Sequence, residues 1–248
     1  MTTNDYPLAI NAYPTPEQMG QAAASAAAPI LREAIAARGS ARLMLAAAPS
    51  QSATLNALAG TDDLDFTRID CFHMDDYIGL APDAPQGFGN WLEDELFRRV
   101  TPQAFHRIDV TAAPEAAATA YREVMGEEPF DVTLCGLGVN GHLAFNDPPA
   151  DFTDPLSARV VELDQVSRQQ QLDEGHFSSI EAVPAHAITV TIPRLLNSRR
   201  IVVSVPTSVK RQAVHDAVNQ PISGAHPGTA LRTHPDVHLF VDAEADPR

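Results

Sequence analysis

Two acidic residues, Asp75 and Asp76, come directly after the apolar segment 66–72. A carboxylate held beside a sugar can act as the base that moves a proton between adjacent carbons. The alternative is a structural turn, in which aspartates accept hydrogen bonds from nearby backbone N–H groups. The pair by itself is compatible with both interpretations.

A glycine-rich segment, 136–141, presents His142 close to Asn140 and Asp147. Histidine is the side chain best suited to proton transfer near neutral pH, and a neighbouring carboxylate orients its ring and raises its pKa. The glycine pattern fails as a dinucleotide fingerprint, because it occurs mid-chain without the strand-ending acidic residue expected further on. A buried structural histidine remains the alternative.

Ser50 and Gln51 stand at the start of a predicted helix, where free backbone N–H groups and the helix dipole attract anions. A serine there is also an ordinary helix cap. Lys210 is the one lysine beside 16 arginines, and it lies at a similar turn of a later unit. We expect Lys210 to meet the same anion as Ser50, the alternative being an ordinary surface lysine.

The net charge of −15 argues against nucleic acid or an anionic membrane as a partner, because both are bound by clustered basic residues. The longest apolar stretch, 22–28, is shorter than a bilayer span and lacks the pattern of a signal peptide. We therefore expect a cytoplasmic protein. Cys71 and Cys135 lie inside apolar runs and are expected to be buried thiols.

Short apolar segments alternate with segments of helical spacing along the chain. The predicted strands are 43–48, 66–72, 105–110, 130–137, 187–192, 201–205 and 237–241. The predicted helices are one capped by Thr15 and ending near Gly39, then 52–58, 91–100 and 114–125, with others around Arg194 and after Thr207. The Pro- and Asp-rich stretch 147–154 is expected to be a loop.

This alternation predicts an α/β fold: a single Rossmann-like domain over residues 1–248, with a mostly parallel sheet and helices on both faces. Ligands of open α/β sheets bind beyond the carboxyl ends of the strands. The polar turns at Ser50, Asp75, His142 and Lys210 are therefore expected to converge.

Two long segments carry a family resemblance. Residues 72–80 (FHMDDYIGL) and 136–148 (GLGVNGHLAFNDP) resemble the two signatures of the glucosamine-6-phosphate deaminase/isomerase family. The likeness extends to the strand before Ser50, the stretch 186–196 and Lys210. It implies a Rossmann-like enzyme that converts glucosamine 6-phosphate and water into fructose 6-phosphate and ammonia, without metal or organic cofactor. A homo-oligomer is compatible with it.

The resemblance also implies roles for individual residues. Asp75 matches the base that takes the C2 proton and returns it at C1, and His142 matches the ring-opening acid/base. Asp147, with Asn140, completes the catalytic set around that histidine. The residues expected to bind the substrate or its phosphate are Ser50, Gln51, Asp76, Gly141, Arg168 and Lys210.

The sequence departs from the usual family pattern at several positions. The family's phosphate turn is often Gly-Gly-Thr, whereas here Ala48 and Pro49 precede Ser50, which removes two flexible positions and one N–H donor. Asn140 and Asp147 stand where some members have Asp and Glu. Gly175 stands where the family has an arginine, and Arg168 is the nearby substitute. No regulatory phosphate-binding residues are recognisable, so allosteric control is not predicted.

Three other functions are open at this point. The same chemistry could act on galactosamine 6-phosphate. A 6-phosphogluconolactonase shares the fold but typically has an Asp-Glu-Arg turn, where this chain has Asp-Asp-Tyr at 75–77. A non-catalytic sugar-phosphate sensor is the third, although no basic DNA-binding segment is present.

Overall fold

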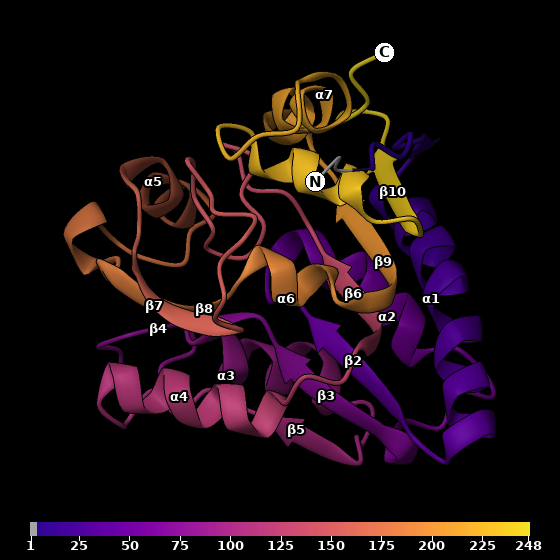
Figure 1. Ribbon diagram of the computed structural model, residues 1–248, viewed down its shortest axis with the longest axis horizontal. Coiled ribbons are helices and arrows are strands. Elements are labelled where there is room, and N and C mark those ends of the chain that lie inside the picture. The colour runs from indigo at the N-terminus through magenta and orange to yellow at the C-terminus, as the bar shows by residue number, and fades with distance from the viewer. Residues whose placement is uncertain (1–3) are drawn as a thin grey trace.

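The computed structural model describes residues 4–248, and its largest sheet has seven strands in that range. Their order is β1-β10-β9-β6-β2-β3-β5, and every neighbouring pair is parallel (Figure 1). The strands are β1 (Ile10–Tyr13), β2 (Ala41–Leu45), β3 (Ile69–His73), β5 (Ala104–His106), β6 (Phe130–Cys135), β9 (Ser198–Val205) and β10 (Val237–Asp242). The predicted α/β fold with a mostly parallel sheet is confirmed.

A second, antiparallel sheet contains β4 (Asp75–Tyr77), β8 (His186–Val190) and β7 (Ala158–Glu162), in that order. It corrects two predictions. The acidic segment expected to be a turn is a strand, because the backbone of Asp75 pairs with that of Thr189. The strand expected over 187–192 belongs to this small sheet and not to the parallel one.

The helices lie between these strands. They are α1 (Pro16–Arg38), α2 (Ser52–Ala59), α3 (Phe88–Leu92), α4 (Pro114–Met125), α5 (Gln165–Asp173), α6 (Ile192–Leu196) and α7 (Arg211–Asn219). Short 3-10 turns occupy Pro49–Gln51, Phe66–Arg68, Ile180–Ala182, Ser208–Lys210 and Pro227–Thr233, and a π-helical turn occupies Glu93–Phe97.

The ends of α1 and α4 agree with the sequence prediction. The side chain of Thr15 accepts a hydrogen bond from the backbone N–H of Gln18, and Gly39 ends α1 with φ of 84°. That left-handed value favours glycine, because it lacks a Cβ. Other boundaries differ: the helix expected over 91–100 starts at Phe88 and continues into the π-helical turn. None of the helices in the described range is long and apolar enough to span a membrane.

Helices cover both faces of the main sheet, as predicted. Leu43 and Leu45 of β2 enter a core cluster that contains the alanine side chains of α1, whereas Met44 enters a second cluster with residues of α4 and α7. This alternation is what a strand buried on both sides requires. Cys71 and Cys135 are buried and free, one in each cluster.

The sheet order determines which strand ends meet. Strands β9, β6, β2 and β3 are consecutive neighbours, and from β2 the chain first adds β3 and β5 on one side and later β6 and β9 on the other. The carboxyl ends of β2 and β6 therefore flank a topological switch point, where ligands of α/β proteins bind. The small sheet lies to the left of the main sheet in Figure 1, with α5 above it.

Candidate active site

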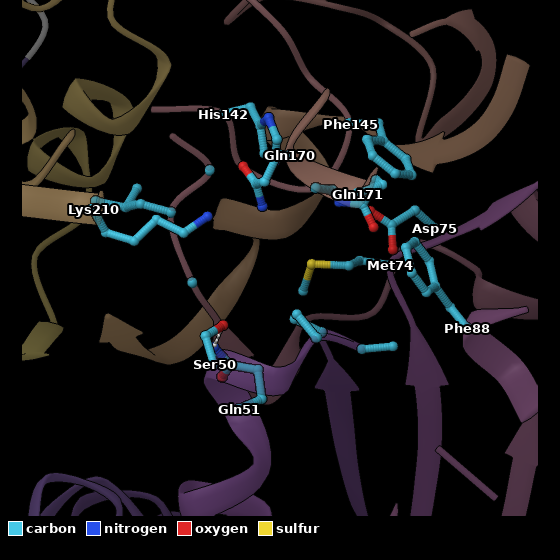
Figure 2. Close-up of a pocket in the computed structure, with 17 residues that line it drawn as sticks. Ser50, Gln51, Met74, Asp75, Phe88, His142, Phe145, Gln170, Gln171 and Lys210 are labelled. Carbon is cyan, nitrogen blue, oxygen red and sulfur yellow. Dashed lines mark hydrogen bonds between the residues drawn. The ribbon is translucent and has the colours of Figure 1, made fainter. Parts of the chain in front are cut away.

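A pocket lies at the carboxyl ends of these four strands and brings the four predicted turns together (Figure 2). The polar and charged side chains that line it are Ser50, Gln51, Asp75, His142, Gln170, Gln171 and Lys210. Phe88 and Phe145 contribute apolar walls. In Figure 2, Asp75 enters from the right, His142 from above, Lys210 from the left and Ser50 from below.

Asp75 is the first residue of β4 and is 6% exposed. Burial raises the pKa of its carboxyl well above the ordinary value, and the nearby charge of Asp76 adds to that rise. A carboxylate with an increased proton affinity, facing a pocket, is suited to take a proton from carbon.

Asp76 points elsewhere. Its Oδ1 accepts hydrogen bonds from the backbone N–H groups of Tyr77 (2.9 Å) and Phe88 (3.0 Å), and its Oδ2 accepts one from Gly89 (3.1 Å). Asp76 therefore stabilises the first turn of α3 and lies outside the pocket lining. The prediction that it contacts substrate is corrected, because both carboxylate oxygens are engaged by backbone donors.

His142 is held by a network on its Nδ1 side. Nδ1 lies 3.1 Å from Oδ1 of Asp147 and 2.9 Å from Oγ of Ser167, whose hydroxyl also bonds to Asp147. The side-chain amide of Asn140 donates to the same Asp147 oxygen (3.0 Å), and its Oδ1 accepts from the backbone N–H of His142 (3.1 Å). Because Nδ1 is engaged, Nε2 is the nitrogen available to a substrate.

Asp147 remains ionised in this network. Burial alone would raise the pKa of its carboxyl, but the hydrogen bonds from His142, Ser167 and Asn140 outweigh burial and lower the pKa to about 2. The backbone N–H of Asp164 also donates to Oδ2 (3.1 Å). An ionised Asp147 fixes the ring orientation of His142 and stabilises its protonated form.

The glycines of the loop make room for the histidine. A Cβ at Gly138 would overlap the imidazole of His142, so the ring requires glycine there. Gly141 has φ of 82° and closes the turn through a hydrogen bond to the carbonyl of Gly138 (2.9 Å). Gly141 is not among the lining residues, and its place in the site is to shape this turn.

Ser50 lies in the 3-10 turn that leads into α2. The side-chain amide of Gln51 donates to Oγ of Ser50 (3.1 Å) and to the carbonyl of Ser204 (3.1 Å). Since Oγ already accepts this bond, the proton of the Ser50 hydroxyl is directed to another acceptor. Gln51 thus orients Ser50 as a donor toward the pocket.

Lys210 ends the 3-10 turn before α7 and is 4% exposed. The alternative of an ordinary surface lysine is therefore wrong. Burial lowers the pKa of its ammonium group, and this effect is opposed by Glu174, whose Oε1 is 3.6 Å from Nζ. Lys210 and Ser50 face one another across the end of the pocket that is remote from Asp75 (Figure 2).

Arg168 does not reach this end of the pocket. Its guanidinium donates to the backbone carbonyls of Ile180 (2.7 Å) and Val183 (3.0 Å), which fastens α5 to the following segment. The prediction that Arg168 substitutes for the family's arginine is corrected for this reason. Gly175 adopts φ of 82° just beyond α5.

Helix α5 supplies pocket residues that sequence reasoning missed. The hydroxyl of Tyr77 donates to Oε1 of Gln171 (2.7 Å), and Gln171 lines the pocket. Oε1 of Gln170 accepts from the backbone N–H of Val139 (2.8 Å). The sequence does contain a helix-start signal here, an aspartate before a run of glutamines. Asp164 caps α5 by accepting a hydrogen bond from the backbone N–H of Ser167 (3.0 Å).

A grouping of three or more His, Cys, Asp or Glu side chains able to hold a metal ion is not found between residues 4 and 248.

Known proteins resemble this chain in sequence and in fold. The model of the family "Glucosamine-6-phosphate isomerases/6-phosphogluconolactonase" matches residues 14–239. The glucosamine-6-phosphate deaminase of Streptococcus pneumoniae serotype 4 is 32% identical over 184 residues, which cover 74% of this chain and 77% of that protein. The enzyme of the same name from Listeria welshimeri is 30% identical over 193 residues, covering 77% and 81%.

Two solved structures share the fold over nearly the whole chain. A monomeric glucosamine-6-phosphate deaminase superimposes with a TM-score of 0.87 at 29% identity, covering 96% of this chain and 98% of that one. A 6-phosphogluconolactonase from Shewanella baltica gives a TM-score of 0.81 at 21% identity, covering 97% and 100%. The second likeness shows the fold alone.

Proposed function

Since this chain belongs to the family of glucosamine-6-phosphate isomerases and 6-phosphogluconolactonases, and is an enzyme of the deaminase type, we propose that it converts glucosamine 6-phosphate and water into fructose 6-phosphate and ammonia. The observation that carries this proposal is the presence of Asp75 and His142 on different walls of one pocket that also contains Lys210. A base, an acid/base and a phosphate-binding cation thus face one substrate volume.

The phosphate end orients the sugar. Lys210 pairs with the phosphoryl group, and the Ser50 hydroxyl donates a hydrogen bond to it. The reacting carbons then lie toward Asp75 and His142, because these residues occupy the remaining walls (Figure 2). Positioning of this kind lowers the entropic part of the barrier.

His142 opens the pyranose ring. Nε2 takes the proton of the C1 hydroxyl and returns a proton to the ring oxygen, which yields the aldehyde. Asp147 and Ser167 hold the imidazole of His142 through Nδ1, so that Nε2 faces the sugar as the proton acceptor. The same contacts stabilise the imidazolium when it forms.

Asp75 then transfers a proton along the chain of the sugar. Its carboxylate takes the proton from C2 while O1 gains a proton from water, which generates an enolamine across C1 and C2; Asp75 then returns its proton to C1, and the positive charge on the C2 nitrogen is lost as a proton to the hydroxide. The resulting imine at C2 is hydrolysed by water, which releases ammonia and leaves the ketone of fructose 6-phosphate. The raised pKa of Asp75 supports this role, because a stronger base is needed to take a proton from carbon.

The test is the release of ammonia from glucosamine 6-phosphate by the purified protein, measured beside galactosamine 6-phosphate and beside the hydrolysis of 6-phosphogluconolactone. We expect ammonia from glucosamine 6-phosphate together with stoichiometric fructose 6-phosphate. Ammonia from the galacto epimer alone would change the sugar and keep the mechanism. Hydrolysis of the lactone without ammonia from either amino sugar would contradict the proposal.

A further inference from the structure

Glu174 lies behind the pocket lining and contacts two lining residues, Lys210 and Gln170, at the end where an anionic substrate group is expected. It follows α5, and its Oε1 lies 3.6 Å from Nζ of Lys210. The same oxygen accepts a hydrogen bond of 2.8 Å from the side-chain amide of Gln170, a pocket-lining residue. One carboxylate oxygen therefore sits between two donors that face the pocket.

Lys210 and Glu174 differ in how much of each side chain is exposed to solvent. Lys210 has only 5% of its side chain exposed, whereas Glu174 has 24% exposed. A buried ammonium requires a counter-ion, which Glu174 provides. The other carboxylate oxygen of Glu174, Oε2, lies 3.8 Å from Nε2 of His176, which is itself partly exposed.

We propose that Glu174 is an internal substitute for the substrate's phosphoryl group: it neutralises Lys210 in the empty pocket and is displaced when phosphate binds. The displacement releases the amide of Gln170, which then joins Lys210 and Ser50 as a phosphate donor. Glu174 thereby weakens phosphate binding, and Gln170 becomes a specificity-determining residue. This inference rests on the proposed function, since it concerns the phosphoryl site of the same substrate.

The charges favour displacement over sharing. A phosphate monoester carries about −1.5 to −2 charges near neutral pH, against one for a carboxylate, so the phosphoryl group interacts more strongly with Lys210. The two anions would repel each other if both remained beside the ammonium. Since 24% of the Glu174 side chain is exposed whereas Lys210 is 5% exposed, Glu174 is the group that moves.

The first test compares Glu174→Gln with the unmodified protein in calorimetric titrations with inorganic phosphate and with fructose 6-phosphate. We expect both ligands to bind about 3- to 10-fold more tightly to the variant, because the competing charge is gone. The matched control is Asp173→Asn, which makes the same charge change on a neighbouring, exposed residue and should leave both affinities within about twofold. Equal or weaker binding by Glu174→Gln would overturn the inference.

The second test separates displacement from a merely structural role. Without ligand, Glu174→Gln should unfold at a lower temperature, because Lys210 loses its counter-ion. At saturating phosphate this difference should disappear. An equal loss of stability with and without phosphate would mean that Glu174 stays in place, and would overturn the inference.

Steady-state kinetics provide a third test, and they distinguish a failure of the Glu174 proposal from a failure of the proposed reaction. Glu174→Gln should lower KM for the phosphosugar without raising kcat. If the unmodified protein releases no ammonia, the reaction fails, and the titrations with inorganic phosphate still test the exchange. If ammonia is released and the variant's affinity for phosphate does not increase, the exchange alone fails.

Discussion

The hydroxyl oxygen of Ser167 lies 2.9 Å from Nδ1 of His142, although the two residues come from different segments of the chain. The same hydroxyl bonds to Asp147, so a serine on α5 and an aspartate of the loop after β6 hold one imidazole. Helix α5 thus takes part in orienting the proposed ring-opening residue.

Ser167→Ala should therefore reduce kcat by roughly 10-fold while KM changes little, because the ring loses one of its two Nδ1 partners. Steady-state kinetics with glucosamine 6-phosphate measure this. Ser167→Thr keeps the hydroxyl and should restore most of the activity. A Ser167→Ala enzyme with unchanged kcat would remove Ser167 from the positioning of His142.

Lys210→Met should act mainly on binding. Loss of a charge-assisted contact to phosphate is expected to raise KM by roughly 10- to 100-fold, with a much smaller change in kcat. The apolar replacement also removes a buried charge, so the folded state should remain intact by circular dichroism. A KM equal to that of the unmodified enzyme would show that the phosphoryl group binds elsewhere.

The pH dependence of kcat/KM should have an acidic limb set by Asp75. Because burial raises the pKa of this carboxyl and only its ionised form accepts a proton, activity should rise with pH through that raised pKa. Asp147, with a pKa of about 2, stays ionised throughout the same range and should add no inflection above pH 4. A profile that is already flat at the ordinary pKa of an aspartate would contradict the assignment.

The carboxyl of Asp75 should also make the free energy of unfolding depend on pH: activity rises with pH, whereas stability should fall. The folded protein holds the Asp75 proton more tightly than the unfolded chain does, so this carboxyl lowers the free energy of unfolding as pH rises above its unfolded value. Asp75→Asn removes that penalty and should raise Tm at neutral pH relative to acidic pH. Thermal unfolding of both proteins from pH 5 to 8 measures the difference. An equal Tm difference at every pH would contradict a raised pKa.

A substitution at Arg168 tests whether this residue stabilises the segment after α5 and does not bind phosphate. Since its guanidinium binds the carbonyls of Ile180 and Val183, Arg168→Met should lower Tm and leave KM for the phosphosugar within about threefold. A large increase in KM with unchanged stability would instead return Arg168 to the phosphate site.

The sequence predicted the boundaries of α1 and α4, which depend on local features. Thr15 and Gly39 delimit α1 through their own capping geometry, and α4 spans the predicted residues 114–125. The convergence of the four polar turns was also predictable from the sequence, because the carboxyl ends of neighbouring parallel strands meet at one edge of the sheet.

Features that depend on distant partners were not predictable in this way. Strand β4 exists because Asp75 pairs with Thr189, which lies far along the chain. Helix α5 has no apolar stripe: its buried residues are Ser167 and Gln171, which point into the polar site. A search for hydrophobic periodicity therefore overlooks the helix that carries Gln170 and precedes Glu174.

The most direct test of the central claim follows the proton at C2. Glucosamine 6-phosphate deuterated at C2 is incubated with the unmodified enzyme and with Asp75→Asn, and ammonia and the label at C1 and C2 are measured by NMR. The account predicts that the unmodified enzyme releases ammonia and removes deuterium from C2, whereas Asp75→Asn binds fructose 6-phosphate normally but does neither. Ammonia release by Asp75→Asn at the rate of the unmodified enzyme would contradict the account.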